Sequence, residues 1–339
     1  YALAGLQREN PKSGEAALKY FLLGSFASAF LIYGIALLYG ASKSTAIFTI
    51  LHDVQSGPEI TALIGLGMVV VGFGFKIALV PFHMWTPDVY QGSPAPVTAF
   101  FSVIPKAAGF AVLISIFSSY WDSPLYSGAI RNALWVLAVL TMIFGNILAI
   151  KQRNIKRMLA YSSIAHAGYI LIAVLAQDNF SLLFYFTVYL FMNIGAFTAV
   201  TALSRKGAEY QELDQYAGIG FKYPWIGATL AVFLFSLAGF PPTGGFLAKF
   251  YIFSAAVRQD LIPLVIIGVL ASLISVYYYL RVIVFMYMRE PVQKLEIFVE
   301  NPALFLVLFI CLYGVLQLGI FPGNIIIFIK QAVMSFPLP

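Results

Sequence analysis

Charged residues are scarce in this chain of 339 residues, where they make up 10%, while hydrophobic residues make up 61%. A typical soluble domain is about a quarter charged and about half apolar. The composition therefore excludes an ordinary soluble protein. Many of the apolar runs approach or exceed the roughly 20 residues that a helix needs to cross a bilayer. The sequence predicts an all-α polytopic membrane protein.

Cysteine is almost absent, and so are the usual cofactor motifs. Cys311 is the one cysteine, which excludes an internal disulfide and a thiolate metal site. No Gly-rich phosphate loop, metal-spaced His and Glu set, heme motif or iron–sulfur motif occurs. We therefore expect no cofactor, no metal and no redox chemistry in this chain. The net charge is +6, and the basic residues lie beside apolar runs. We therefore expect lipid and no nucleic acid as a partner.

Hydropathy predicts about nine membrane-spanning helices, and two of them are interrupted. The second continues past Pro81 as a short amphipathic piece that ends at Gly92, and the seventh is interrupted at "AGFPPTGGF", residues 238–246. The predicted spans lie near 15–39, 60–80, 95–118, 127–150, 155–176, 180–203, 224–257, 261–288 and 302–329.

Basic residues are distributed unequally between the two predicted sides of the membrane. Lysine and arginine favour the inner side. When the helices are counted alternately, one side collects Arg8, Lys12, Lys151, Arg153, Lys156, Arg157, Arg205, Lys206, Lys222, Arg289 and Lys294. The other collects Lys43, Arg131, Arg258 and Lys330. We therefore expect the first side to be inside and the C-terminus to be outside.

Topology does not explain three lysines, Lys76, Lys106 and Lys249, which lie within apolar spans. A lysine at the centre of a membrane helix has an unfavourable insertion energy of about 2.5–3.5 kcal/mol, so it must face protein, water or a partner. Either it extends to the headgroups, or it serves as a proton site, because burial lowers the pKa of lysine and a nearby carboxylate restores it. Arginine does not deprotonate in proteins. Glu15 and Lys19, one helical turn apart, add a charged pair near the inner end of the first span, where Lys19 either extends to the headgroups or acts with Glu15.

Two of these lysines lie close to proline breaks. Pro81 follows Lys76, and Pro241 and Pro242 precede Lys249. Non-helical backbone at membrane depth occurs within protein or beside water, and in transporters paired breaks mark ion sites in inverted repeats. The alternative is that these prolines only kink their helices.

Two histidines and a few carboxylates complete the candidates. His83 lies seven residues after Lys76, and His166 lies among hydroxyl residues in "YSSIAHAGY". Each histidine either relays protons near neutral pH or is a neutral group in a polar interface. We interpret Asp88 and the run Glu209, Glu212 and Asp214 as capping or surface carboxylates.

Three long segments resemble one known family. They are "FKIALVPFHMWTPDVYQGSPAPVTAFFSVIPKAAGF" (75–110), "NIKRMLAYSSIAHAGY" (154–169) and "SLAGFPPTGGFLAKFYIF" (236–253). They resemble the antiporter-like membrane subunits of complex I, the proton-pumping NADH:quinone oxidoreductase. "EAALKYFLLGS" and "YYYLRV" point to the branch that corresponds to mitochondrial subunit 2.

The resemblance implies a fold of about fourteen helices with two inverted repeats, of which nine helices fall in this sequence. Residues 1–120 would be the remainder of the first repeat, 121–290 the second repeat, and 291–339 a C-terminal helix. By resemblance, Lys76 lies on the first broken helix, Lys106 links two half-channels, and Lys249 is the outward exit. Glu15 and Lys19 match a charged pair. The family's glutamate partner for Lys76, in a "GxELxSL"-like motif, does not occur here.

The resemblance also implies a function and its partners. The chain would be a non-redox, proton-translocating subunit of the translocase in a bacterial inner membrane. Homologous antiporter-like subunits and small membrane subunits would be its neighbours, while NADH, FMN, iron–sulfur clusters and quinone would bind to other subunits. Two alternatives stay open, namely a stand-alone multi-subunit cation/proton antiporter and a structural membrane spacer.

Overall fold

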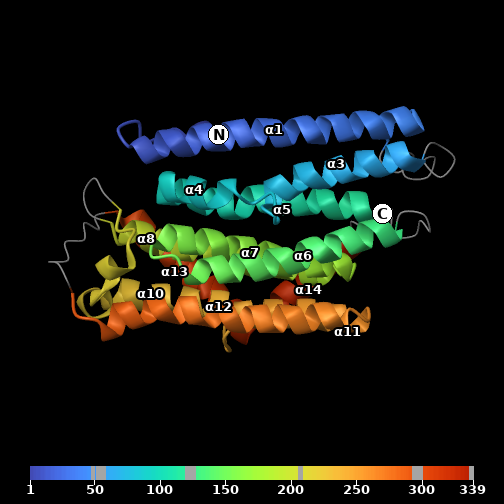
Figure 1. Ribbon diagram of the computed structural model, residues 1–339. Helices are drawn as coiled ribbons and strands as arrows, with labels where there is room; N and C mark the ends of the chain where they lie inside the picture. The colour runs from blue at the N-terminus through green and yellow to red at the C-terminus, as the bar shows by residue number, and fades with distance from the viewer. Residues whose placement is uncertain (47–49, 51–58, 119–126, 205–208, 292–300, 336–339) are drawn as a thin grey trace.

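The computed structural model describes residues 1–46, 50, 59–118, 127–204, 209–291 and 301–335. Within those ranges the chain is helical and forms no β-strand. The helices pack side by side as an elongated bundle (Figure 1). Their bounds are η1 Ala2–Gly5, α1 Pro11–Ser42, α3 Glu59–Ile77, α4 Trp85–Gly92, α5 Ala95–Ser118, α6 Ser127–Ile150, α7 Ile155–Leu175, α8 Asn179–Ala202, η3 Leu213–Tyr216, α9 Ile219–Lys222, α10 Pro224–Ala238, α11 Gly244–Arg258, α12 Ile262–Met288, α13 Pro302–Ile320 and α14 Gly323–Ser335.

The predicted spans are confirmed in type and approximate position. Across the described ranges, eight helices are long and apolar enough to cross a membrane: α1, α3, α5, α6, α7, α8, α12 and α13. The consecutive shorter helices α10 and α11 account for the seventh predicted span, near 224–257, which was expected to be interrupted. The short elements η1, η3 and α9 were not predicted, because a single turn leaves no hydrophobic period to detect.

Helix α7 forms the core of the bundle. In its most apolar window 94% of residues are buried, compared with 22% for α1, which lies along one edge (Figure 1). Glycines allow α6 to approach α7 closely, since a Cβ on Gly145 would come within 2.7 Å of the Ala165 nitrogen. A side chain on α7 therefore meets protein groups almost everywhere along its length.

The first broken helix is α3 followed by α4. Helix α3 ends at Ile77, and the backbone between Ala78 and Met84 lacks α-helical structure. The Trp85 indole donates to the carbonyl of Phe75 at 3.0 Å, and the Val80 amide donates to the Thr141 hydroxyl at 3.0 Å. The side chains of Trp85 and Thr141 thus bind backbone groups at the break, because polar backbone at membrane depth needs hydrogen-bond partners.

The second broken helix is α10 followed by α11, and the break itself is residues 239–243. Gly239 ends α10 with φ +89°, a conformation that favours glycine. Pro241 and Pro242 follow it and are exposed. The amide of Gly245, at the start of α11, donates to the Ser236 hydroxyl at 3.1 Å. Proline and glycine therefore end one half-helix before the next begins.

The prediction of one continuous helix over 302–329 is wrong. Helix α13 ends at Ile320, and α14 begins at Gly323. Pro322 disfavours helical backbone at the preceding residue, and Phe321 has φ −130° and ψ 61°. The apolar run continues across this point, so hydropathy alone could not show the break.

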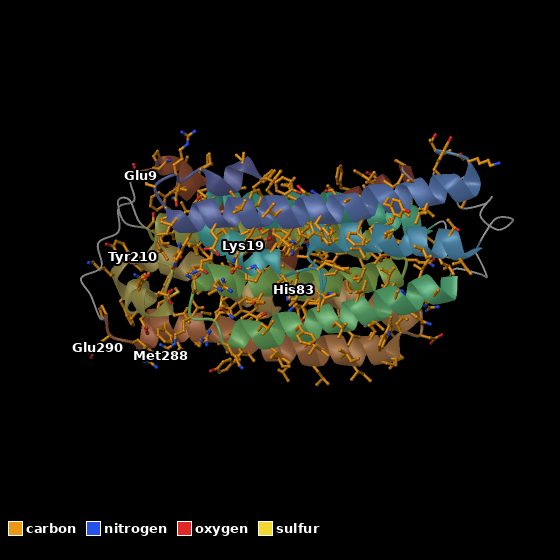
Figure 2. All side chains as sticks on the ribbon, turned by 45° about the horizontal axis from the view of Figure 1, so that its top comes forward. Glu9, Lys19, His83, Tyr210, Met288 and Glu290 are labelled. Atoms are coloured by element: carbon orange, nitrogen blue, oxygen red, sulfur yellow. The ribbon has the colours of Figure 1, made fainter. Side chains whose placement is uncertain are left out.

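One end of the bundle includes Arg8, Arg153, Lys156 and Arg289, and we call it the basic end. Glu9, Tyr210, Met288 and Glu290 lie there (Figure 2). The C-terminal label lies at the opposite end (Figure 1). Arg205, Lys206 and Lys294, which contributed to the predicted charge bias, lie outside the described residues.

Candidate functional site

Lys106 is buried in the middle of the bundle. It lies on α5 and is 1% exposed. Its ammonium group donates to the hydroxyl of Ser163 at 2.6 Å and to the carbonyl of the same residue at 2.7 Å, both on α7. Over the described part of the chain it forms no ion pair. Lys106 therefore does not extend to the headgroups, and neutral oxygens hold it.

Lys249 is also buried, at 6% exposure, on the second half of the broken helix. Its ammonium group donates to the carbonyls of Leu237 at 3.1 Å and Ala238 at 2.9 Å, and to the hydroxyl of Ser272 at 2.8 Å. It also lies 5.1 Å from the centre of the Tyr169 ring. The last carbonyls of α10 carry the negative end of the helix dipole, so they stabilise a cation.

A surface cavity of about 770 Å³ reaches Lys249 from the side of the bundle. Lys249 and Ser272 are among its few polar lining residues, and the remainder is mostly apolar surface of α11 and α12. Phe250 and Leu273, which line it, are exposed. Lys249 therefore joins the interior of the bundle to an open volume.

A hydrogen-bonded group of residues extends from Lys106 toward His166. The Tyr189 hydroxyl donates to the Ser163 hydroxyl at 2.9 Å, and Ser163 is the partner of Lys106. The rings of Tyr189 and His166 are 5.3 Å apart between centroids. His166 lies one turn after Ser163 on α7, so both side chains are on the same face. The polar contacts of Lys106 thus reach Tyr189, whose ring packs against that of the histidine.

His166 is buried and is bound through both ring nitrogens. Its Nδ1 lies 2.6 Å from the Tyr185 hydroxyl, and its Nε2 lies 3.2 Å from the Tyr279 hydroxyl. Tyr279 also hydrogen-bonds Ser162, and its ring packs against that of its neighbour Tyr278, with 4.5 Å between the ring centroids. The histidine is therefore a junction between α7, α8 and α12.

The contacts continue from Tyr278 to Lys249. The Tyr278 hydroxyl donates to the Asn146 carbonyl oxygen at 2.9 Å, and the Asn146 amide donates to the Tyr169 hydroxyl at 3.1 Å. The Tyr169 ring in turn lies against the Lys249 ammonium group, which donates to Ser272. We call the side chains between the two lysines the central polar row: Ser163, Tyr189, His166, Tyr279, Tyr278, Asn146, Tyr169 and Ser272.

Lys76 and His83 do not join the central polar row through any described contact. Lys76 is half-buried in the last turn of α3, and its ammonium group lies 5.6 Å from the centre of the Tyr1 ring. Within the described ranges no carboxylate pairs with it. His83 lies near the middle of the bundle (Figure 2). Its Nδ1 is buried and has no partner among the described residues, and the break after Ile77 removes the helical relation to Lys76 that the spacing suggested.

Glu15 and Lys19 form an ion pair, at 2.6 Å, and belong to a larger cluster. Lys19 also pairs with Asp88 at 2.8 Å, and the other oxygen of Asp88 accepts from Arg157 at 2.5 Å. Arg157 donates to Gln91 at 2.9 Å as well. Asp88 was interpreted as a capping or surface carboxylate, and that interpretation is wrong, because its two oxygens connect α1 to α7.

A second ion pair was also missed. Lys156, counted only as a topological charge, has a side chain that is 1% exposed and pairs with Glu209 at 2.7 Å. The other oxygen of Glu209 accepts from the Ala95 amide at 2.8 Å, at the start of α5. Glu209 thus caps a helix, as expected, but it also neutralises a buried lysine.

Sequence reasoning found Tyr169 among the hydroxyl residues around His166 but missed Asn146 and the other tyrosines of the central polar row, Tyr189, Tyr278 and Tyr279. A tyrosine in an apolar span has the same pattern as a core aromatic, and its hydroxyl gives no periodic signal. The four-residue spacing of Tyr185 and Tyr189 is a further local hint, because it places both side chains on the same face of α8. Among the described residues, no three His, Cys, Asp or Glu side chains come together as a metal site.

The sequence is similar to a known family of membrane proteins. The family described as NADH:quinone oxidoreductase/Mrp antiporter, TM matches residues 1–275. NADH-quinone oxidoreductase subunit N of Trichlorobacter lovleyi is 48% identical over 339 residues, covering 98% of this chain and 69% of that protein.

Two solved structures are similar as well. A chain of respiratory complex I from Thermus thermophilus has a TM-score of 0.82 and 35% identity, covering 96% of this chain and 71% of that one. A chain of the Mrp complex from Dietzia sp. has a TM-score of 0.86 at 20% identity. The match covers 98% of this chain and 70% of that one and shows a shared fold. The chain therefore belongs to the family of antiporter-like membrane subunits of NADH:quinone oxidoreductases and Mrp antiporters.

Proposed function

We propose that this chain is a proton-translocating, non-redox subunit in the membrane arm of a NADH:quinone oxidoreductase. One observation carries the proposal: two buried lysines, Lys106 and Lys249, are joined by the central polar row. Lysine can lose and regain a proton when its surroundings change, whereas arginine cannot. Hydroxyl, amide and imidazole groups between the two amines supply the donors and acceptors that a proton needs.

Lys76 would respond first in this mechanism. Quinone reduction elsewhere in the complex would shift a charge along the membrane arm and change the proton occupancy of Lys76. The proton would then pass to Lys106, through the central polar row, and to Lys249. The carbonyls of Leu237 and Ala238 hold the Lys249 ammonium, and the adjoining cavity gives the proton a place to leave. Each step moves one proton between groups of this chain.

The proposal extends to the surroundings of the chain. The basic end would face the inside of a bacterial inner membrane, and the C-terminus would lie outside. Homologous antiporter-like subunits, small membrane subunits and lipid would be the neighbours. NADH, FMN, iron–sulfur clusters and quinone would bind to other subunits, because this sequence has no motif for them. Residues 1–120 and 121–290 would belong to two repeats, and 291–339 would follow them.

The experiment is to replace Lys106 or Lys249 with alanine in the assembled complex. Quinone reductase activity and proton pumping are measured in proteoliposomes, and assembly is checked on blue-native gels. We expect pumping to fall strongly in both variants while assembly is retained. Lys12→Ala, an exposed lysine on α1, is the control and should pump normally. Normal pumping by assembled Lys106→Ala and Lys249→Ala complexes would reject the proposal and favour a structural spacer.

A stand-alone cation/proton antiporter is the second candidate, and the shared fold with the Mrp chain favours it. The two candidates differ in their assembly. A subunit of the oxidoreductase should co-migrate with NADH-oxidising activity on a native gel. Migration with cation/proton exchange activity and without NADH oxidation would select the antiporter.

A further inference from the structure

The ion pair between Lys156 and Glu209 lies apart from the central polar row, near the basic end. Lys156 donates to the Ser93 carbonyl at 2.5 Å in addition to its contact with Glu209 at 2.7 Å. Its side chain is 1% exposed, whereas that of Glu209 is 15% exposed. The pair thus has one member buried in the bundle and one member that water can reach.

From this pair a polar stripe on α5 leads to Lys106. Thr98, Ser102 and Lys106 are spaced by four residues, so they share one face of the helix and span about 12 Å. Thr98 and Ser102 are fully buried. The Thr98 hydroxyl lies 3.4 Å from the Ser93 carbonyl, which is the carbonyl that accepts from Lys156. The stripe therefore begins at the ion pair and ends at Lys106.

The middle of the stripe is connected to the partner of Lys106. The Asn193 amide donates to the Ser102 hydroxyl at 2.6 Å and to the Tyr189 hydroxyl at 3.2 Å. Tyr189 in turn donates to Ser163, the residue that binds Lys106. Hydrogen bonds through Asn193 and Tyr189 on α8 thus connect Ser102, in the middle of the stripe, to the partner of Lys106.

Two buried polar atoms along this route have no partner among the described residues. They are the hydroxyl oxygen of Ser93 and the side-chain oxygen of Asn193. Buried polar atoms are normally hydrogen-bonded, to ordered water where protein groups do not reach them. The carbonyl of Ser93 binds Lys156, and Asn193 contacts the middle of the stripe. Water molecules can therefore hydrogen-bond to these oxygen atoms along the route.

We propose that Glu209 and Lys156 form a proton inlet at the basic end that loads Lys106 directly, without passage through Lys76. This inference rests on the proposed function and replaces one step of it, the transfer of the proton from Lys76 to Lys106. The Lys156 ammonium gives a proton along the stripe to neutral Lys106, so one N–H bond breaks and another forms. The Glu209 carboxylate then takes up a proton from the aqueous phase at the basic end and passes it to neutral Lys156, which restores the ion pair.

The test uses the assembled complex in proteoliposomes and measures the rate of NADH-driven proton pumping. Thr98→Val and Ser102→Ala each remove one hydroxyl from the stripe and leave the ion pair intact, while Glu209→Gln removes the inlet carboxylate. We expect each variant to lower the pumping rate by about a hundredfold, the lower end of the range for loss of a proton-transfer group. Asp214→Asn, an exposed carboxylate near Glu209, is the matched control and should pump normally.

The outcomes separate the inlet from the proposed function. If Lys106→Ala abolishes pumping while Thr98→Val and Ser102→Ala pump at the normal rate, the inlet is wrong and the proposed function stands. The same two variants decide the question if Glu209→Gln fails to assemble. A purely structural role of the ion pair would lower the melting temperature of the Glu209→Gln complex without slowing the stripe variants, and that result would also overturn the inlet.

Discussion

The ammonium group of Lys249 binds the C-terminal end of α10 through the carbonyls of Leu237 and Ala238. These carbonyls have no donor within their own helix, so the lysine replaces the missing backbone hydrogen bonds. Gly239 ends the same helix, and a Cβ on it would lie 3.0 Å from Cδ of Lys249. The helix break and the buried amine are therefore parts of one local structure.

Gly239→Ala should disturb that structure. Its φ of +89° disfavours any side chain by about 1–2 kcal/mol, and the new methyl group would press on the lysine. We expect a lower melting temperature of the assembled complex and slower pumping. Gly67→Ala, in α3 with nothing within 4 Å of the new Cβ, is the control and should be neutral or stabilising. Equal behaviour of the two variants would contradict the role assigned to Gly239.

Ser163→Ala should weaken the start of the central polar row. The Ser163 hydroxyl contacts both Lys106 and Tyr189, whereas its carbonyl would still bind Lys106. We expect pumping to fall less than in Lys106→Ala, because the amine keeps one acceptor. Ser28→Ala, whose hydroxyl bonds the Gly24 carbonyl of its own helix, is the control. A pumping rate for Ser163→Ala equal to that of the control would show that the proton does not pass this hydroxyl.

Much of the fold and part of the site could be predicted from the sequence. Apolar length defined the spans, and the lysine with the adjacent prolines marked the break before Lys249. Composition could not show which carboxylate meets which cation, because Asp88 and Glu209 find their partners on helices far apart in the sequence. Tyr169 could be found from its place beside His166, whereas Tyr189, Tyr278 and Tyr279 were missed because a buried phenol has the sequence pattern of an ordinary aromatic core residue.

Asp88→Asn should loosen the contact between α1, α4 and α7. One oxygen of Asp88 binds Lys19 and the other binds Arg157, so the variant weakens two ion pairs at once. Glu15→Gln removes only a contact to Lys19 from a side chain that is 60% exposed, and should change stability by less than about 1 kcal/mol. We expect the melting temperature of the complex to fall clearly for Asp88→Asn and little for Glu15→Gln.

Salt provides an independent check on that cluster. Its side chains are partly exposed, so dissolved ions should screen the attraction between them. The difference in melting temperature between the wild-type and Asp88→Asn complexes should therefore shrink as the salt concentration rises. A difference that does not change with salt would mean that Asp88 acts through packing.

Tyr185→Phe and Tyr279→Phe distinguish a proton relay at His166 from a purely structural interface. Each variant removes one hydroxyl from one nitrogen of the same histidine, at a cost of about 1–3 kcal/mol for the unpaired group. Tyr279, however, belongs to the central polar row, which continues through Tyr278, whereas Tyr185 is a side branch. If protons travel through this row, Tyr279→Phe should slow pumping much more than Tyr185→Phe. Because Tyr279 also bonds Ser162, the melting temperature of each complex is measured to separate lost stability from lost proton transfer. Equal pumping rates in the two variants would show that His166 only holds the helices together.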